Sequence, residues 1–233
     1  MQILRNYLEK IGIEYTDDMI EKFSGYMDGI LEWNEKINLT AITDRDEFVT
    51  KHFVDSVLGV NLPEYKDAAS VIDVGTGGGF PGIPLAIVSP DKRFILADSL
   101  KKRLKVIDDL ADKNSIDNVE TVHGRAEELA RKKEYRDTFD VCVSRAVANL
   151  SVLLEYCLPF IRVGGCLMAY KGPDAEKEIA GASNALKALG GEVVRTERVS
   201  LDGFDHNIVI IKKTKPTPKK YPRKAGTPLK EPL

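Results

Sequence analysis

The part of the sequence best suited to chemistry is a glycine-rich stretch at residues 71–85, which reads VIDVGTGGGFPGIPL. Its first residues predict a buried strand, and its last residues predict the start of a helix. Glycines in the turn between them permit positive φ angles and a close approach of the backbone to a ligand. The free N–H groups of the following helix suit a carboxylate or a phosphate. The stretch therefore predicts a ligand-binding turn.

Two classes of ligand bind at turns of this kind. A dinucleotide site needs a glycine where this chain has Phe80, whose ring would crowd the contact between helix and strand. Sites for S-adenosylmethionine carry an acid two residues before the first glycine, as Asp73 precedes Gly75 here. In such sites the acid faces the ammonium group of the ligand, and Gly75 and Gly77 pass under its methionine end. We therefore favour a methyl donor, with a dinucleotide as the alternative.

The next predicted strand, residues 93–98, ends in a second acid, Asp98. A carboxylate at this strand end can accept hydrogen bonds from both ribose hydroxyls of a bound adenosine. Asp98 also precedes Ser99 and a helical segment, so capping that helix is the alternative role. We expect ribose recognition because the glycine turn lies upstream.

Segments with the composition of strands alternate with helix-length segments from residue 70 onward. They lie at residues 71–74, 93–98, 119–122, 139–144 and 165–170, followed by 192–201 and 207–213. Helices between successive strands predict βαβ units and a parallel sheet. The last two strands are joined only by the turn 202–206, so they must run antiparallel. This layout predicts an α/β class I (Rossmann-like) methyltransferase fold, with a seven-stranded, mostly parallel sheet and an antiparallel terminal hairpin.

Three regions differ in composition. Residues 1–66 carry apolar side chains at helical spacing and predict a small N-terminal helical region, with helices starting near residues 3, 16 and 46. Residues 67–213 form the expected methyltransferase domain. Residues 214–233 form a basic, proline-rich tail, and the segment 212–233 carries a net charge of +7 and five of the 11 prolines. Since proline disfavours helices and central strands, we expect an extended arm that either contacts a phosphate-rich partner or aids solubility.

The predicted strand 139–144 leads into the sequence SRA at residues 144–146, which in this fold lies beside the transferred methyl group. The Asn/Asp-Pro-Pro-Tyr/Phe motif of enzymes that methylate exocyclic amines is absent here. Methylation of C5 in pyrimidines needs a nucleophilic cysteine, but apolar surroundings predict inert thiols for Cys142, Cys157 and Cys166. A ring nitrogen has a lone pair and needs neither a base nor a cysteine. No catalytic residue is therefore assigned, and Arg145 and Lys171 are candidate pocket residues.

The composition is that of an ordinary globular protein, with 233 residues, 43% hydrophobic and 30% charged, and a formal net charge of -2. Apolar runs are much shorter than the ~18 residues that a membrane-spanning helix requires, and the first residues do not resemble a signal peptide. Three cysteines without a CxxC pair and three isolated histidines predict neither a disulfide framework nor a metal site. We expect a cytoplasmic protein without metal or membrane partners.

Several longer motifs resemble the RsmG (GidB) family, bacterial methyltransferases that act on guanine N7 of 16S ribosomal RNA. The resemblance covers nearly the whole chain and is most specific in the segments FPGIP at residues 80–84, SRA at 144–146 and KYPR at 220–223. The segments WNEKINLT at 33–40 and KHFVDS at 51–56 also belong to it. The resemblance implies S-adenosylmethionine as the cofactor. It also implies the guanine at position 527 as the target, in 16S rRNA or in the small ribosomal subunit.

The resemblance also implies residue roles. The expected cofactor-binding residues from residues and resemblance together are Asp73, Gly75, Gly77, Phe80, Asp98, Ser99, Ala126, Glu127 and Arg145. The expected RNA-binding residues are Lys36, Asn38, Lys219, Lys220, Arg223 and Lys224. We expect a monomer. The alternatives are an RNA-binding or ribosome-assembly factor that keeps the fold, or a methyltransferase for another RNA base or for a protein.

Overall fold

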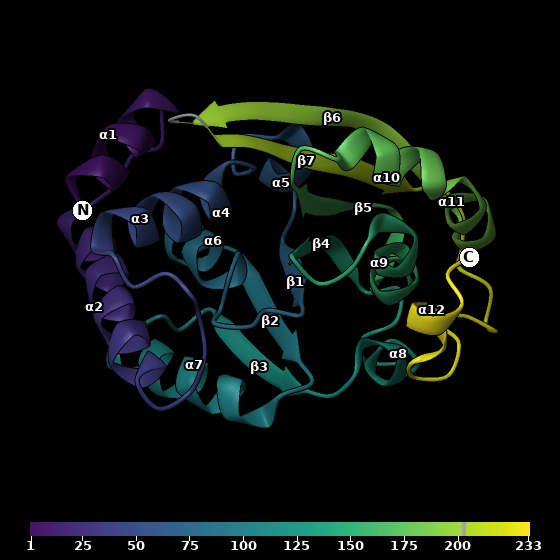
Figure 1. Cartoon of the computed structure of the whole chain (residues 1–233), viewed down its shortest axis with the longest axis horizontal. Coiled ribbons are helices and arrows are strands. Elements are labelled where there is room, and N and C mark those ends of the chain that lie inside the picture. Colours follow the sequence, from purple (N-terminus) through teal and green to yellow (C-terminus); the bar gives the residue numbers. More distant parts are fainter. Residues whose placement is uncertain (202–203) are drawn as a thin grey trace.

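The computed structural model describes residues 1–201 and 204–233. Its centre is a seven-stranded sheet with the order β3-β2-β1-β4-β5-β7-β6 (Figure 1). The strands are β1 (Ser70–Val74), β2 (Arg93–Asp98), β3 (Val119–His123), β4 (Phe139–Arg145), β5 (Ile161–Lys171), β6 (Gly191–Leu201) and β7 (Phe204–Lys213). Strands β1 to β5 are parallel to their neighbours among themselves, whereas β7 runs antiparallel to both β5 and β6. The predicted class I fold with its terminal hairpin is confirmed.

Two strands extend beyond their predicted bounds. Strand β5 begins at Ile161 rather than near residue 165, because Ile161 pairs with Phe139 at the start of β4. Strand β7 begins at Phe204 rather than at residue 207. The hairpin turn predicted at 202–206 includes residues 202 and 203, which lie outside the described residues.

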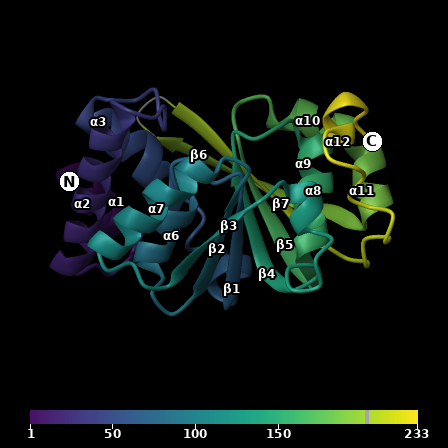
Figure 2. The same ribbon diagram turned by 90° about the horizontal axis from the view of Figure 1, so that it is seen from below.

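Helices cover both faces of the sheet (Figure 2). One layer and its core take in α1 (Gln2–Lys10), α2 (Asp17–Asn34), α3 (Arg45–Phe48), α4 (Asp55–Val57), α5 (Pro63–Lys66), α6 (Gly82–Val88) and α7 (Lys101–Lys113). The opposite layer holds α8 (Ala126–Leu129), α9 (Leu150–Cys157), α10 (Ala175–Gly181), α11 (Ser183–Leu189) and α12 (Thr227–Lys230). Side chains of α1 and α2 share one hydrophobic core with those of β1 and α6. The N-terminal helices are therefore packed on the sheet and do not form a core of their own.

The third N-terminal helix departs from the regular helix expected from residue 46 onward. It consists of α3, a π-helical segment at Val49–Val54, and α4. The backbone N–H of Asp55 binds the carbonyl of Thr50, five residues earlier, which is the bond pattern of a π-helix. This wider turn carries Lys51, His52 and Asp55. Such segments often occur at functional sites, and this one lies next to the end of β4, as described below.

The sheet order also identifies where a ligand would bind. Strands β1 and β4 are neighbours, and the chain leaves them in opposite directions, toward β2 on one side and β5 on the other. Parallel α/β sheets bind ligands outside the carboxyl ends of the strands at such a switch point. The glycine turn follows β1, Asp98 ends β2, and Arg145 ends β4. The predicted site residues therefore meet at one edge.

The basic tail is folded, so the expectation of an extended arm is wrong. Residues 214–233, called the C-terminal strap from here on, pack against the layer of α8 and α9 and end in the short helix α12 (Figure 1). Thr217, Tyr221 and Pro228 are buried within it. Proline composition excludes regular helices and central strands, but it does not prevent a segment from packing through its side chains and carbonyl groups.

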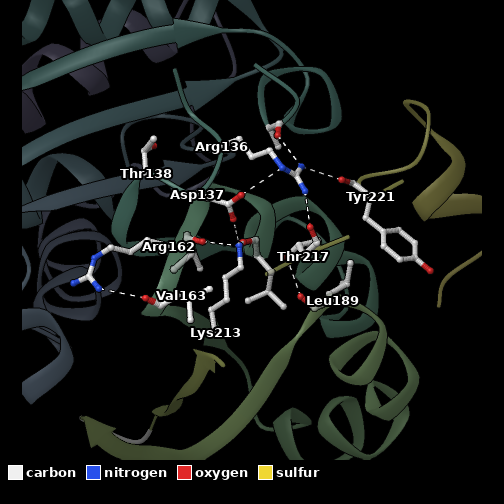
Figure 3. A network of polar contacts seen from close by, with 12 residues as sticks. Arg136, Asp137, Thr138, Arg162, Val163, Leu189, Lys213, Thr217 and Tyr221 are labelled. Carbon is white, nitrogen blue, oxygen red and sulfur yellow. Dashed lines mark hydrogen bonds and ion pairs between the residues drawn. The ribbon is translucent and has the colours of Figure 1, made fainter. Parts of the chain in front are cut away.

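Two cations from outside the strap organise its first half (Figure 3). The guanidinium of Arg136 donates to the carbonyls of Thr217 at 2.8 Å and Tyr221 at 3.0 Å. Lys213, fully buried at the end of β7, is paired with Asp137 and donates to the carbonyl of Ile161 at 2.6 Å. Burial lowers the pKa of Lys213 because it penalises the charged amine. These bonds fix the direction in which the strap leaves the sheet.

One ion pair holds the second half of the strap. Glu155 of α9 is fully buried, and the guanidinium of Arg223 faces it with Nη2 at 2.7 Å from Oε2 and Nε at 3.0 Å from Oε1. The backbone N–H of Arg223 also donates to Oε1 at 2.6 Å. A buried carboxylate needs such compensation for the water that it has lost. The structure therefore corrects the expected RNA contact of Arg223, because its charge is used inside the fold.

Replacement of Arg223 by methionine should destabilise the protein strongly. The variant would leave the Glu155 carboxylate buried without its cation, which costs about 3–5 kcal/mol when a buried pair loses one partner. The free energy of unfolding in urea would measure this loss. Lys224→Met is the matched control, because Lys224 is the next residue and is exposed. Equal stability of the two variants would contradict the role assigned to Arg223.

Candidate active site

The glycine turn after β1 is held closed by the carboxylate of Asp73. Its Oδ2 accepts a hydrogen bond from the Thr76 hydroxyl at 2.7 Å and another from the backbone N–H of Gly82 at 2.8 Å. These two bonds join the strand end to the start of α6. Within the turn, Gly75 has φ +76° and Gly77 has φ +61°, a region that side chains with a Cβ rarely adopt.

Asp73 is fully buried, and burial raises its pKa to about 7. The hydrogen bonds from Thr76 and Gly82 act in the opposite direction but do not outweigh the loss of water. Its second oxygen, Oδ1, has no hydrogen-bond partner among the described residues. A buried oxygen in this state can accept a bond from an ammonium group or from a bridging water. The expected role toward the ammonium of a methyl donor stays a prediction.

Asp98 links the glycine turn to the helix that follows β2. Its Oδ2 accepts from the backbone N–H of Gly77 at 2.9 Å, and its Oδ1 accepts from that of Leu100 at 2.8 Å. Both roles considered from the sequence are therefore compatible with its place, since one oxygen supports the start of α7 and the residue also lines a pocket. Each carboxylate oxygen can accept a second hydrogen bond, which leaves room for ribose hydroxyls.

A pocket of about 340 Å³ lies beside these carboxylates. Of the expected cofactor residues, it is lined by Gly75, Asp98, Ser99, Ala126 and Glu127. The remaining expected residues lie outside its lining: Asp73, Gly77, Phe80 and Arg145. The partnerless oxygen of Asp73, the glycine cradle and an acid at the end of β2 fit adenosylmethionine. The pocket also includes Arg103, Val147 and Tyr156, which sequence reasoning did not assign to it.

The C-terminal strap contributes to this pocket through Glu127. Oε1 of Glu127 accepts a hydrogen bond from the backbone N–H of Gly226 at 2.8 Å. Glu127 is buried and lines the pocket, so the strap supports one of its walls. No sequence signal connects residues 99 positions apart, and this contact could not be predicted from either segment alone.

A larger pocket of about 850 Å³ opens at the ends of β4 and β5. Its charged and polar lining includes Asp55, Arg145, Lys171, His206 and Asn207. Arg145 is paired with Asp55, and its Nη1 also donates to the carbonyl of Lys51 at 3.0 Å. Asp55 in turn lies 2.7 Å from Nδ1 of His206. These partners hold the pKa of the Asp55 carboxyl below its usual value despite burial. Arg145 thus lines this pocket rather than the smaller one.

Phe80 and His52 form the support behind Arg145. Their rings stack with centroids 4.4 Å apart and an interplanar angle of 8°, and the guanidinium of Arg145 lies 5.6 Å from the Phe80 centroid. Burial and the charge of Arg145 lower the pKa of His52 to about 3, so this imidazole is neutral. Nδ1 of His52 faces Nη2 of Arg145 at 3.3 Å and must accept. The ring proton is therefore on Nε2, which donates to the Thr40 hydroxyl at 2.7 Å.

The contact with Thr40 brings the segment 36–40 to the active-site edge. Asn34 holds this segment with its Oδ1, which accepts from the N–H groups of Leu39 at 2.8 Å and Thr40 at 3.0 Å. Lys36 and Asn38 are exposed on it. On the C-terminal strap, Lys219, Lys220 and Lys224 are exposed as well. Apart from Arg223, the expected RNA-binding residues are therefore on the surface, and their contact with RNA stays a prediction.

Lys171 does not point freely into the larger pocket. Its Nζ donates to the carbonyl of Ala148 at 2.6 Å and to Oε2 of Glu178 at 2.7 Å. The same oxygen of Glu178 accepts from the backbone N–H of Leu150 at 2.7 Å. Lys171 and Glu178 together fix the loop after β4. Lys171 is thus a positioning residue for the pocket wall.

The two pockets share the loop residues Ala146 and Val147. Ala146 has φ +56°, a strained angle for a residue other than glycine, and the side chain of Val147 is 38% exposed. A Cβ added to Gly75 would lie 2.4 Å from Cγ2 of Val147. The absence of a side chain at position 75 is therefore what allows this loop to approach the glycine turn and brings the pockets together.

Nucleophilic cysteine and metal chemistry have little support in the described part of the chain. All three cysteines are buried, and burial raises the pKa of the Cys166 thiol to about 12 and that of Cys142 well above its usual value. Among the described residues no cluster of histidine, cysteine and acidic side chains has the arrangement of a metal site. No helix in residues 1–201 and 204–233 is long and apolar enough to cross a membrane.

Comparisons with known proteins identify the family. The model of the GidB family, described as rRNA small subunit methyltransferase G, matches residues 19–209. The chain belongs to this family. The ribosomal RNA small subunit methyltransferase G of Clostridium novyi (strain NT) is 48% identical over 233 residues, which cover 99% of this chain and 96% of the relative. The enzyme of the same name from Clostridium kluyveri is 47% identical, covering 100% of this chain and 98% of the relative.

Solved structures of more distant proteins agree with the fold. An O-methyltransferase from Bacillus cereus, determined in complex with SAH, has a TM-score of 0.58 and 17% identity over 89% of this chain and 96% of that chain. A putative O-methyltransferase from Klebsiella pneumoniae has a TM-score of 0.57 and 15% identity, with 90% and 96% covered. At this identity the likeness shows the GidB-family chain to have a methyltransferase fold and nothing more specific.

Gly75→Ala and Gly77→Ala should separate the two demands on the glycine turn. Both variants strain a positive φ at a cost of about 1–2 kcal/mol in stability. Only Gly75→Ala also forces a Cβ against Val147, whereas the nearest atoms to a Cβ at Gly77 are 4.0 Å away. We therefore expect affinity for adenosylmethionine, measured by calorimetry, to fall at least ~10-fold in Gly75→Ala and much less in Gly77→Ala. Equal losses would show that backbone strain alone limits the pocket.

Proposed function

We propose that this member of the GidB family transfers a methyl group from S-adenosylmethionine to N7 of the guanine at position 527 in 16S rRNA. The observation that carries the proposal is the meeting of two pockets at Ala146 and Val147, one fitted to the donor and one lined by Arg145 and Lys171. The names of the relatives supply the substrate class, a small-subunit ribosomal RNA. We place the reaction in the cytoplasm, on rRNA or on the small subunit.

Bound adenosylmethionine would supply an electrophilic methyl group on its sulfonium. The protein's task is then to orient the target base, because N7 of guanine already has a lone pair and requires no general base. Lys171, by holding the Ala148 carbonyl, keeps the loop between the pockets in one conformation. Val147 adds an apolar surface where the methyl group would pass, which helps to exclude water. Orientation and desolvation of this kind can supply most of the acceleration.

The ion pair between Arg145 and Asp55 has a specific use in this reaction. Methylation at N7 converts a neutral guanine into a cation, and a bare guanidinium beside the base would oppose that change. Asp55 offsets the charge of Arg145. The guanidinium still has N–H groups beyond its contacts with Asp55, Lys51 and His52, which are its partners among the described residues. These groups are available to the O6 atom of the base or to a phosphate.

The direct test is methylation of 16S rRNA that lacks the modification. The purified protein would be incubated with donor and with either free rRNA or intact small subunits, and the product mapped by nuclease digestion and mass spectrometry. We expect a methyl group at N7 of guanine 527, and none with Gly75→Val. A methyl group on another base would replace the proposed target. RNA binding without methylation of either substrate would favour an assembly factor.

Lys171→Met should slow methylation without changing donor affinity. The variant removes the bond to Ala148 and loosens the loop between the pockets, but Lys171 is not part of the smaller pocket. We expect kcat to fall at least ~10-fold, equivalent to about 1.4 kcal/mol, while the Kd for adenosylmethionine stays within twofold. Lys177→Met is the matched control, because Lys177 is exposed and pairs with Asp174 on the surface. A parallel loss of donor affinity would contradict the positioning role.

A further inference from the structure

Arg103 is placed where the sequence did not suggest a functional residue. It follows two other cations, Lys101 and Lys102, which together look like the solvated face of a helix. In the structure Lys101 and Lys102 are exposed, whereas Arg103 lines the smaller pocket. Side chains in the first turn of a helix lean toward its N-terminus, and the N-terminus of α7 adjoins the carboxyl end of β2. The geometry of the helix thus separates Arg103 from its neighbours.

The guanidinium of Arg103 reaches the glycine turn. Its Nη1 lies 4.0 Å from the position that a Cβ of Gly77 would occupy. The nearest strand-end acid is Asp98, but both of its oxygens accept backbone N–H groups, from Gly77 and Leu100. Within residues 1–201 and 204–233, no ion pair of Arg103 with a carboxylate is recorded. A half-buried cation therefore faces the pocket at its glycine end.

The charges of the donor match this arrangement. Adenosylmethionine carries a neutral adenosine and an amino-acid end with one ammonium and one carboxylate. The glycine turn is the expected seat of the amino-acid end, and Asp73 is the acid nearest to that turn. An acid can meet the ammonium, but the carboxylate needs a cation or N–H donors. A guanidinium is well suited to a carboxylate because it can bind both oxygens.

We propose that Arg103 binds the carboxylate of the donor's amino-acid moiety. The inference rests on the proposed function, since it takes adenosylmethionine as the ligand of the smaller pocket. It makes Arg103 a residue that selects ligands with an amino-acid end over ligands that carry adenosine alone. The adenosine part is left to the residues at the ends of β2 and β3.

Calorimetry with two ligands tests this assignment. Adenosylmethionine is compared with 5′-methylthioadenosine, which keeps the adenosine and the sulfur but has neither carboxylate nor ammonium. We expect Arg103→Gln to weaken adenosylmethionine binding about 10- to 100-fold, the range for lost charge-assisted hydrogen bonds. The affinity for 5′-methylthioadenosine should stay within twofold. Lys102→Gln, the same charge change on the neighbouring exposed residue, should alter neither affinity, and Arg103→Lys should recover part of the loss.

Each other result has a defined meaning. If wild-type protein binds adenosylmethionine and Arg103→Gln binds it equally well, the inference is overturned and the proposed function is untouched. The same holds if the variant loses affinity only for 16S rRNA, because Arg103 would then be a phosphate contact. Equal losses for both ligands would make Arg103 a structural part of the pocket and would also overturn it. Failure of the wild-type protein to bind either ligand would overturn the proposed function and this inference with it.

Discussion

Two buried carboxylates at the ends of neighbouring strands hold the glycine turn, and the rest of the site depends on them. Asp73 ties the turn to the start of α6, and Asp98 ties it to the start of α7. A carboxylate removed from water must recover its hydrogen bonds from the protein, so these N–H partners have little freedom. The backbone at Gly75 is thereby kept where Val147 can approach it. The contact between the two pockets follows from this restraint.

Buried acids organise the opposite layer in the same way. Glu155 on α9 and Glu127 on α8 bind the C-terminal strap through Arg223 and the N–H of Gly226. The positive charge of the strap is thus divided between two tasks. Arg223 compensates a buried carboxylate, while Lys219, Lys220 and Lys224 remain on the surface. A count of basic residues along the sequence does not distinguish these tasks, because the distinction depends on which acid lies opposite.

The features that could be predicted from the sequence are those with a local cause. Hydrophobic runs and the glycine turn define β1, β2 and the binding edge, since period and turn chemistry act over a few residues. The strap was mispredicted because its partners lie about 70 to 100 residues away in the chain. The π-helix at Val49–Val54 was missed because its apolar spacing differs little from that of an α-helix over six residues. Arg103 was missed for a similar reason, since its role depends on one position within a basic run.

The folded state of the strap changes how its lysines can meet RNA. A free arm of this length would have to lose backbone and side-chain freedom when it bound, and that loss would subtract from the affinity. The strap has already lost much of that freedom through Arg136, Glu155 and Glu127. Its exposed lysines are therefore presented from a nearly fixed backbone, at a lower entropic cost. Because Gly226 of the same strap binds a residue that lines the smaller pocket, any shift of the strap on RNA also acts on that pocket wall. If such a shift changes affinity for the donor, the donor must change affinity for RNA by the same factor, since coupling between two binding sites is reciprocal.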